Sequence, residues 1–173
     1  MKHYLIGSLA LASALLLGMA DGQAQQKDWK EIRIGTEGAY PPFNNLNAKK
    51  ELEGFEIDYA NALCAKMAVK CTWVVQDWDG IIPALLSNKY DVIVAGMNAT
   101  DERKKRVDFT NVYTRTPISM AAARSVTSVD VSPEALKGKT IGAQASTIHM
   151  NFLEAHYKGS TARGYPTQEE ANL

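Results

Sequence analysis

The sequence contains 173 residues, of which 46% are hydrophobic and 22% are charged, a composition that supports a globular core. Its 19 basic residues balance its 19 acidic residues, so the formal net charge is zero. This balance excludes the basic excess that is typical of nucleic-acid-binding proteins, and we expect no nucleic-acid partner.

Residues 1–24 are predicted to form a cleavable secretory signal peptide. The basic residue Lys2 precedes a mostly apolar run over residues 5–20. Small residues at 22 and 24 then offer a cleavage site before Gln25, and cleavage after Ala20 is the alternative. The run is shorter than the roughly 20 residues that a membrane-spanning helix needs. Because no cysteine lies near the cleavage region, we expect a released protein rather than a lipid-anchored one.

The two cysteines, Cys64 and Cys71, are predicted to form a structural disulfide. An even pair this close in an exported protein favours a bridge. The C-x-x-C spacing of a redox motif is absent, and no metal-binding partners lie nearby in the sequence.

Strands and helices alternate along the first half of the exported chain. We predict strands at 32–36, 71–75 and 91–96, helices at about 54–67, 78–88 and 101–106, and a turn-rich loop at 37–47. This order favours a doubly wound α/β lobe. The first helix is predicted to bury Ile57, Ala60, Leu63, Cys64 and Met67 and to expose its polar residues, among them Glu56, Asp58 and Lys66.

The second half begins with an extended, charge-poor segment at 113–123. Beyond it we predict a short helix at 132–138, a strand at 140–145, a helix capped by Ser146, a strand at 161–165 and a helix capped by Thr167. Since the sequence stops at Leu173, inside that last helix, we expect a fragment whose second lobe is incomplete.

Four motifs occur in the same order in a known family. They are Gly35-Thr36-Glu37-Gly38-Ala39-Tyr40-Pro41-Pro42-Phe43, Gly54-Phe55-Glu56-Ile57-Asp58-Tyr59, Asp77-Trp78-Asp79-Gly80-Ile81-Ile82-Pro83 and Thr100-Asp101-Glu102-Arg103. The chain resembles the periplasmic solute-binding proteins of family 3, which bind polar amino acids. It looks closest to the branch that binds lysine, arginine, ornithine, histidine and opines. That branch shares the Cys64–Cys71 pairing, and Tyr59 departs from the aliphatic or phenylalanine residue usual at its position.

The resemblance implies a type II periplasmic binding protein fold of class α/β, with two doubly wound lobes joined at a hinge. Residues 25–115 would form lobe 1 and residues 116–173 part of lobe 2. It also implies a periplasmic monomer without a cofactor, which captures an amino acid or opine and delivers it to the membrane permease of an ABC importer.

The resemblance further assigns ligand-binding roles. Arg103 would clamp the ligand α-carboxylate with its planar guanidinium, and Thr147, at a helix N-terminus, would contact the same group. Tyr40 and Trp78 would sandwich the ligand side chain, and Glu37 would face its cationic end.

Three further positions of the matched site lie at or just after the end of the third predicted strand. Gly96 could offer its carbonyl to the ligand ammonium, and Asn98 its amide oxygen. Serine is more usual at Asn98 and at Ala95, and glycine is usual at Ser146, so these positions are expected to alter selectivity.

Other functions remain open at the level of sequence. The principal alternative is a periplasmic enzyme on the same fold, similar to the cyclohexadienyl dehydratases, with a cleft carboxylate as acid. A sensor domain of a larger receptor is a further alternative. His149 and His156 lie two helical turns apart, but no third ligand is evident in the sequence, so we predict no metal site.

Overall fold

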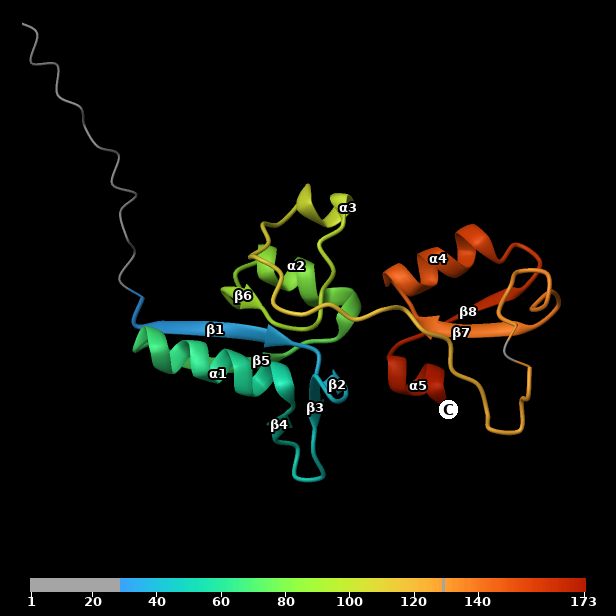
Figure 1. The fold of residues 1–173 in the computed structure, drawn as a ribbon. Coiled ribbons are helices and arrows are strands. Elements are labelled where there is room, and N and C mark those ends of the chain that lie inside the picture. The colour runs from blue at the N-terminus through green and yellow to red at the C-terminus, as the bar shows by residue number, and fades with distance from the viewer. Residues whose placement is uncertain (1–28, 129) are drawn as a thin grey trace, which may run out of the picture.

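The computed structural model describes residues 29–128 and 130–173 (Figure 1). The predicted signal peptide lies outside these described residues. Within them, no helix is long and apolar enough to cross a membrane. The described chain forms two lobes joined by an extended segment. We call the part from β1 to α3 lobe 1 and the part from β7 to α5 lobe 2.

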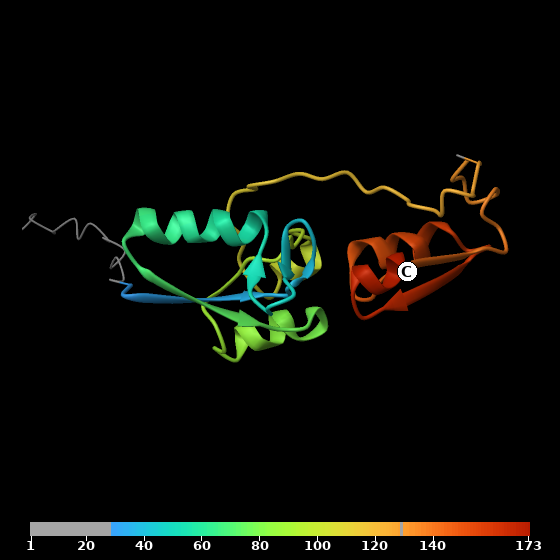
Figure 2. The ribbon, with the colours of Figure 1, turned by 90° about the horizontal axis from the view of Figure 1, so that it is seen from below.

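Lobe 1 is built on a three-stranded parallel sheet. Its strand order is β5 (Lys70–Val75), β1 (Glu31–Thr36) and β6 (Val92–Ile93). The helices α1 (Phe55–Met67) and α2 (Ile81–Leu86) lie on opposite faces of this sheet (Figure 2). This arrangement is the predicted doubly wound lobe. The strand predicted at 91–96 is shorter than expected, because the chain leaves the sheet after Ile93.

Each helix of lobe 1 encloses its own part of the core. Ile34, Ala60 and Cys64 are buried between the sheet and α1. Ile81 and Tyr90 are buried on the α2 side of the sheet. The sheet is therefore covered by apolar side chains on both faces, as parallel sheets require.

Two short helices flank α2 and complete lobe 1. The 3₁₀ helix η1 (Trp78–Gly80) directly precedes α2, so the predicted helix at 78–88 begins in tighter 3₁₀ form. Helix α3 (Asp101–Lys104) follows Thr100, whose hydroxyl accepts a hydrogen bond from the Arg103 amide at 3.2 Å. The predicted cap is therefore confirmed, although α3 is shorter than expected.

The segment predicted as a loop at 37–47 contains strands. β2 (Ala39–Tyr40) and β3 (Asn44–Leu46) pair antiparallel, and β4 (Leu52–Glu53) extends this small sheet. The strands were not predicted because they are only two or three residues long and the segment is rich in turn residues.

The predicted buried face of α1 is partly wrong. Leu63 and Met67 are exposed, whereas Glu56, predicted to face solvent, is fully buried. The row that faces inward is Glu56, Ala60 and Cys64, spaced four residues apart. Glu56 can occupy this row because other parts of lobe 1 surround its carboxylate with hydrogen-bond donors.

Three segments donate hydrogen bonds to the Glu56 carboxylate. One oxygen accepts from Asn44 Nδ2 at 2.7 Å, and the other accepts from the Gly96 amide at 2.7 Å and from the Tyr113 hydroxyl. Asn44 in turn accepts from the Gly38 amide at 2.9 Å. Glu56 thus connects α1 to the small antiparallel sheet, to the loop after β6 and to the segment that leaves lobe 1.

The predicted disulfide is confirmed. Cys64 in α1 is bonded to Cys71 in β5, and the bridge closes a loop with a sequence separation of 7 residues. It therefore ties the helix that carries Glu56 to an edge strand of the sheet.

Lobe 2 contains a parallel pair of strands, β7 (Thr140–Gln144) and β8 (Thr161–Tyr165), with the helices α4 (Ile148–His156) and α5 (Gln168–Asn172). Ala143, Leu153 and Tyr157 form its core. The four elements agree with the sequence prediction, including the Thr167 cap of α5, which accepts from the Glu170 amide at 3.1 Å.

Two local predictions in lobe 2 are wrong. Residues 132–138 form a series of turns rather than a helix, because only one helical turn fits before Gly138 adopts a positive φ of 75°. The cap of α4 is Thr147 rather than Ser146. The Thr147 hydroxyl accepts from the Met150 amide at 3.3 Å, while Ser146 has a left-handed φ of 56°.

The substitution Glu56→Gln should destabilise the protein by about 2–3 kcal/mol, because it removes charge-assisted hydrogen bonds in a buried site. The amide nitrogen of the glutamine is a donor, and at either oxygen position it would face another donor, Asn44 Nδ2 or the Gly96 amide. Urea denaturation would measure the change. The control Asp58→Asn, at an exposed position of the same helix, should cost less than about 0.5 kcal/mol. Equal costs for the two variants would contradict the role of Glu56.

Candidate functional site

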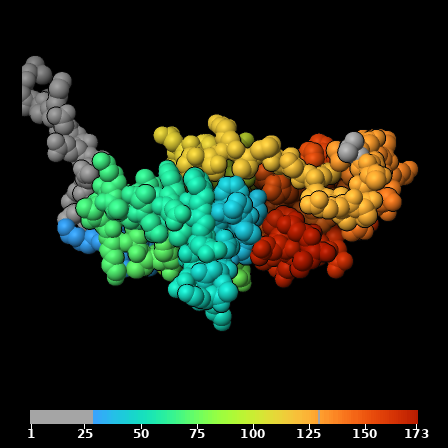
Figure 3. All heavy atoms as spheres, turned by 60° about the horizontal axis from the view of Figure 1, so that its bottom comes forward, coloured from blue at the N-terminus to red at the C-terminus, as the bar shows by residue number. Residues whose placement is uncertain are grey.

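A cleft of about 420 Å³ lies between the two lobes (Figure 3). Its volume is within the range of small-molecule sites, roughly 300–1,000 Å³. The structure brings all eight predicted ligand-binding residues to this cleft: Glu37, Tyr40, Trp78, Ala95, Gly96, Asn98, Arg103 and Thr147.

The carboxyl ends of the strands position these residues. Glu37 directly follows β1, Trp78 follows β5 by three residues, and Ala95 follows β6 by two. Thr147 follows β7 in the same way on the other lobe. Since parallel strands end at one edge of a sheet, residues far apart in the sequence converge there, which is where open α/β sheets bind ligands.

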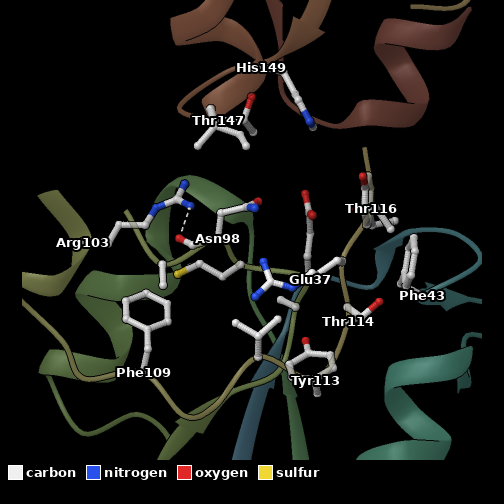
Figure 4. Close-up of a pocket in the computed structure, with 18 of the residues that line it drawn as sticks. Glu37, Phe43, Asn98, Arg103, Phe109, Tyr113, Thr114, Thr116, Thr147 and His149 are labelled. Carbon is white, nitrogen blue, oxygen red and sulfur yellow. Dashed lines mark hydrogen bonds between the residues drawn. The ribbon is translucent and has the colours of Figure 1, made fainter. Parts of the chain in front are cut away.

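Arg103 is held by backbone carbonyls from both lobes. Its Nη1 donates to the Asn98 carbonyl at 3.0 Å (Figure 4), and its Nη2 donates to the Ser146 carbonyl at 3.3 Å. The guanidinium also lies over the Trp78 ring, 5.2 Å from its centroid. Burial lowers the pKa of Arg103, but an arginine remains cationic in proteins. The cleft therefore holds a fixed positive charge.

The Ser146 carbonyl links the lobes a second time. It accepts from the Trp78 Nε1 of lobe 1 at 3.1 Å, in addition to Arg103. The left-handed backbone of Ser146 accounts for the glycine that is usual there, since glycine adopts this conformation without strain.

Glu37 makes another contact between the lobes. Its side chain is buried, with the residue only 7% exposed, and it accepts a hydrogen bond from Gln144 Nε2. Gln144 also donates to the Pro166 carbonyl at 3.0 Å. Burial raises the pKa of Glu37, and the nearby Asp77 and Asp79 act in the same direction, while the hydrogen bond from Gln144 opposes them.

A hydrogen bond to the buried Glu56 holds the loop after β6 in place. The Gly96 amide donates to Glu56, and Gly96 has a positive φ of 59°, which favours glycine. Asn98 contributes its backbone carbonyl, to Arg103, and Ala95 is buried at 5% exposure.

Thr147 and Tyr40 form opposite walls of the cleft. The Thr147 hydroxyl donates to the Gln144 carbonyl at 2.7 Å and caps α4, so the first amides of this nine-residue helix point toward the cleft side of lobe 2. Tyr40 stacks on Phe43 with ring centroids 5.5 Å apart, and burial raises its pKa.

The cleft lining also contains residues that were not predicted as ligand contacts, among them Arg115, Gln144 and His149. The polar Gln144 at the end of the strand was an available signal for this position. Burial lowers the pKa of His149. In residues 29–128 and 130–173, no group of three or more His, Cys, Asp or Glu side chains is arranged to hold a metal ion.

Comparison with known proteins gives consistent matches. The family model described as bacterial extracellular solute-binding proteins, family 3, matches residues 32–163. An L-arginine-binding protein of Pseudomonas aeruginosa is 40% identical over 167 residues, which cover 95% of this chain and 64% of that protein. An octopine-binding periplasmic protein of Rhizobium meliloti is 37% identical over 186 residues, covering 94% of this chain and 62% of that protein.

A solved structure shares the fold. It is an ancestral amino acid-binding protein described as a precursor of cyclohexadienyl dehydratase, with a TM-score of 0.77 and 32% sequence identity. The match covers 83% of this chain and 64% of that one. The chain therefore spans less than two-thirds of the length of these relatives, and it has their type II periplasmic binding protein fold.

The raised pKa of Glu37 implies a defined pH dependence of stability. Between the ordinary pKa near 4.5 and the higher folded value, the folded state binds more protons than the unfolded state, so the free energy of unfolding falls as pH rises. Glu37→Gln should remove this fall. Urea denaturation of both proteins at pH 4 to 8 should show the variant gaining stability relative to the wild type as pH rises above about 4.5. A difference in unfolding free energy between the two proteins that does not change with pH would contradict the raised pKa of Glu37.

Proposed function

Because the chain belongs to family 3 of the bacterial extracellular solute-binding proteins, we propose that the protein captures a polar amino acid or opine with a cationic end group and delivers it to an ABC importer. The relatives named for arginine and octopine support this ligand class. The observation that carries the proposal is the convergence of Arg103, Trp78, Glu37 and Thr147 on one cleft between two lobes.

The charge arrangement supports an amino acid ligand. Arg103 on lobe 1 and the start of α4 on lobe 2 both favour a carboxylate, the first by its bidentate donors and the second by its amide groups. A carboxylate bound there would replace the carbonyls of Asn98 and Ser146 as acceptors for the guanidinium. A charged acceptor forms a stronger hydrogen bond with arginine than a neutral carbonyl does.

The far end of the ligand would lie at Glu37. In the structure this carboxylate accepts from the neutral amide of Gln144. A guanidinium or ammonium group is a stronger partner for a carboxylate than an amide is, so a basic ligand would gain more there than a neutral one. The aromatic faces of Trp78 and Tyr40 would pack against the aliphatic stem between the two charged ends.

The cellular role rests on the family. A periplasmic relative supports the proposal that the protein acts in the periplasm after export. The proposal also includes a monomer that docks on a membrane permease. The proposal involves no cofactor and no nucleic acid.

One observation favours a second candidate, an enzyme similar to the cyclohexadienyl dehydratases. Glu37 is a buried cleft acid whose pKa is raised by burial, a property that suits a proton donor. The similar solved structure is described as a precursor of such an enzyme. Turnover of prephenate or arogenate by the complete protein would favour this candidate over the binding protein.

A thermal-shift screen of the complete protein against amino acids and opines tests the proposed function. A ligand that binds only the folded state raises the melting temperature in a concentration-dependent way.

Arg103→Ala should weaken binding of every such ligand at least about 100-fold in calorimetry, because it leaves the carboxylate without its cation. Arg106→Ala, outside the cleft, is the matched control and should bind normally. Near-native affinity of the Arg103 variant would refute the clamp.

Glu37→Gln should change selectivity rather than binding as a whole. Arginine affinity should fall about 10- to 100-fold, since a charged hydrogen bond is lost, whereas glutamine affinity should change less than about threefold. Calorimetric titration with both amino acids measures the ratio. Equal losses would show that Glu37 does not contact the end of the ligand side chain.

A further inference from the structure

A second arginine, Arg115, lines the cleft and has no partner. It lies in the segment that joins the lobes, its side chain is exposed, and no hydrogen bond or ion pair engages it among the described residues. Among the other arginines, Arg106 and Arg124 also have no described side-chain partner, but they do not line this cleft, whereas Arg33 and Arg103 are engaged. Arg33 pairs with Asp91 at 2.8 Å, and Arg103 donates to two carbonyls. Arg115 is thus a cation that faces the cleft with its hydrogen-bonding capacity unused.

The charges of the described cleft lining are unbalanced. Two guanidinium groups, of Arg103 and Arg115, face one carboxylate, that of Glu37. The Glu37 carboxylate is already hydrogen bonded to Gln144 across the cleft. The lining therefore offers two sites for anions and one for a cation.

The wall that carries Arg115 is held in place. Tyr113, two residues earlier, donates its hydroxyl hydrogen bond to the buried Glu56 and stacks on Tyr59 with ring centroids 5.2 Å apart. Figure 4 shows Tyr113, Thr114 and Thr116 along this wall, with Thr147 and His149 on the other lobe. Residues 110–116 all line the cleft, so the anchored Tyr113 lies on the same cleft wall as Arg115.

Enclosing an unpaired cation in a closed cleft costs free energy unless an anion accompanies it. We propose that Arg115 binds a second carboxylate of the ligand. This inference rests on the proposed function and refines it: the preferred ligand is an N-carboxyalkyl derivative of a basic amino acid, the opine class, rather than the free amino acid. Such a molecule carries two carboxylates and one cationic end, which complement the two arginines and Glu37.

Octopine and arginine form a matched pair of probes, because octopine is arginine with a carboxyethyl group on its α-nitrogen. Calorimetry on the complete wild-type protein should show tighter binding of octopine. Arg115→Gln should lower octopine affinity about 10- to 100-fold and change arginine affinity less than about threefold. Arg115→Lys, which keeps the charge, should recover part of the loss. Arg124→Gln, on the same segment but outside the cleft, is the control and should alter neither affinity.

The outcomes distinguish the role of Arg115 from the proposed function. Arginine binding that is tighter than octopine binding, or equal losses for both ligands in Arg115→Gln, would overturn the role of Arg115 and leave the proposed function intact. Failure of the wild-type protein to bind octopine would overturn the role of Arg115, and the proposed function would fall only if the thermal-shift screen found no amino acid or opine that binds. Because Arg115 is exposed, the unliganded variants should melt at the wild-type temperature, which separates a binding defect from misfolding.

Discussion

The buried carboxylate of Glu56 is the interaction on which the site in lobe 1 depends. A fully buried charge is tolerated only when donors surround it, and here they come from Asn44, Gly96 and Tyr113. These three residues belong to the small antiparallel sheet, the loop after β6 and the segment leading to lobe 2. Each of these parts also contributes to the cleft lining. One carboxylate therefore sets the relative positions of Tyr40, the Gly96 loop and the wall that carries Arg115.

Polar hydrogen bonds join the two lobes in the described part of the chain. The Ser146 carbonyl accepts from Trp78 and Arg103, and Gln144 donates to Glu37. The groups of lobe 1 that we propose for ligand binding thus hold the lobes together in this structure. A ligand would exchange these bonds for charge-assisted ones, which explains how binding could bias the closure of the lobes without new elements of structure. Small polar interfaces of this kind permit relative movement of lobes.

Much of the candidate site could be predicted from the sequence. The eight predicted residues fall in local motifs after strands, and strand ends converge in any doubly wound sheet, so their meeting in one cleft follows from the order of elements. The disulfide followed from spacing and export. The errors concern burial, caps and short elements, such as the strands at 39–46 and the turns at 132–138. Leu63, Met67 and Glu56 were misplaced because the pattern of a helix does not reveal which distant segments cover it, and Ser146 was taken for a cap because the left-handed turn before α4 has no polar signature.

The sequence by itself determined the family, the α/β class, the disulfide and the residues of the cleft, because these depend on motifs and on the short-range periodicity of strands and helices. Only the tertiary structure decided which polar groups meet. The pairing of Glu56 with Tyr113 spans 57 residues, and that of Glu37 with Gln144 spans 107. Whether a charged side chain is solvated, satisfied or unpaired depends on such distant partners. For the same reason the sequence alone did not indicate Arg115, which the fold places in the cleft without a partner among the described residues.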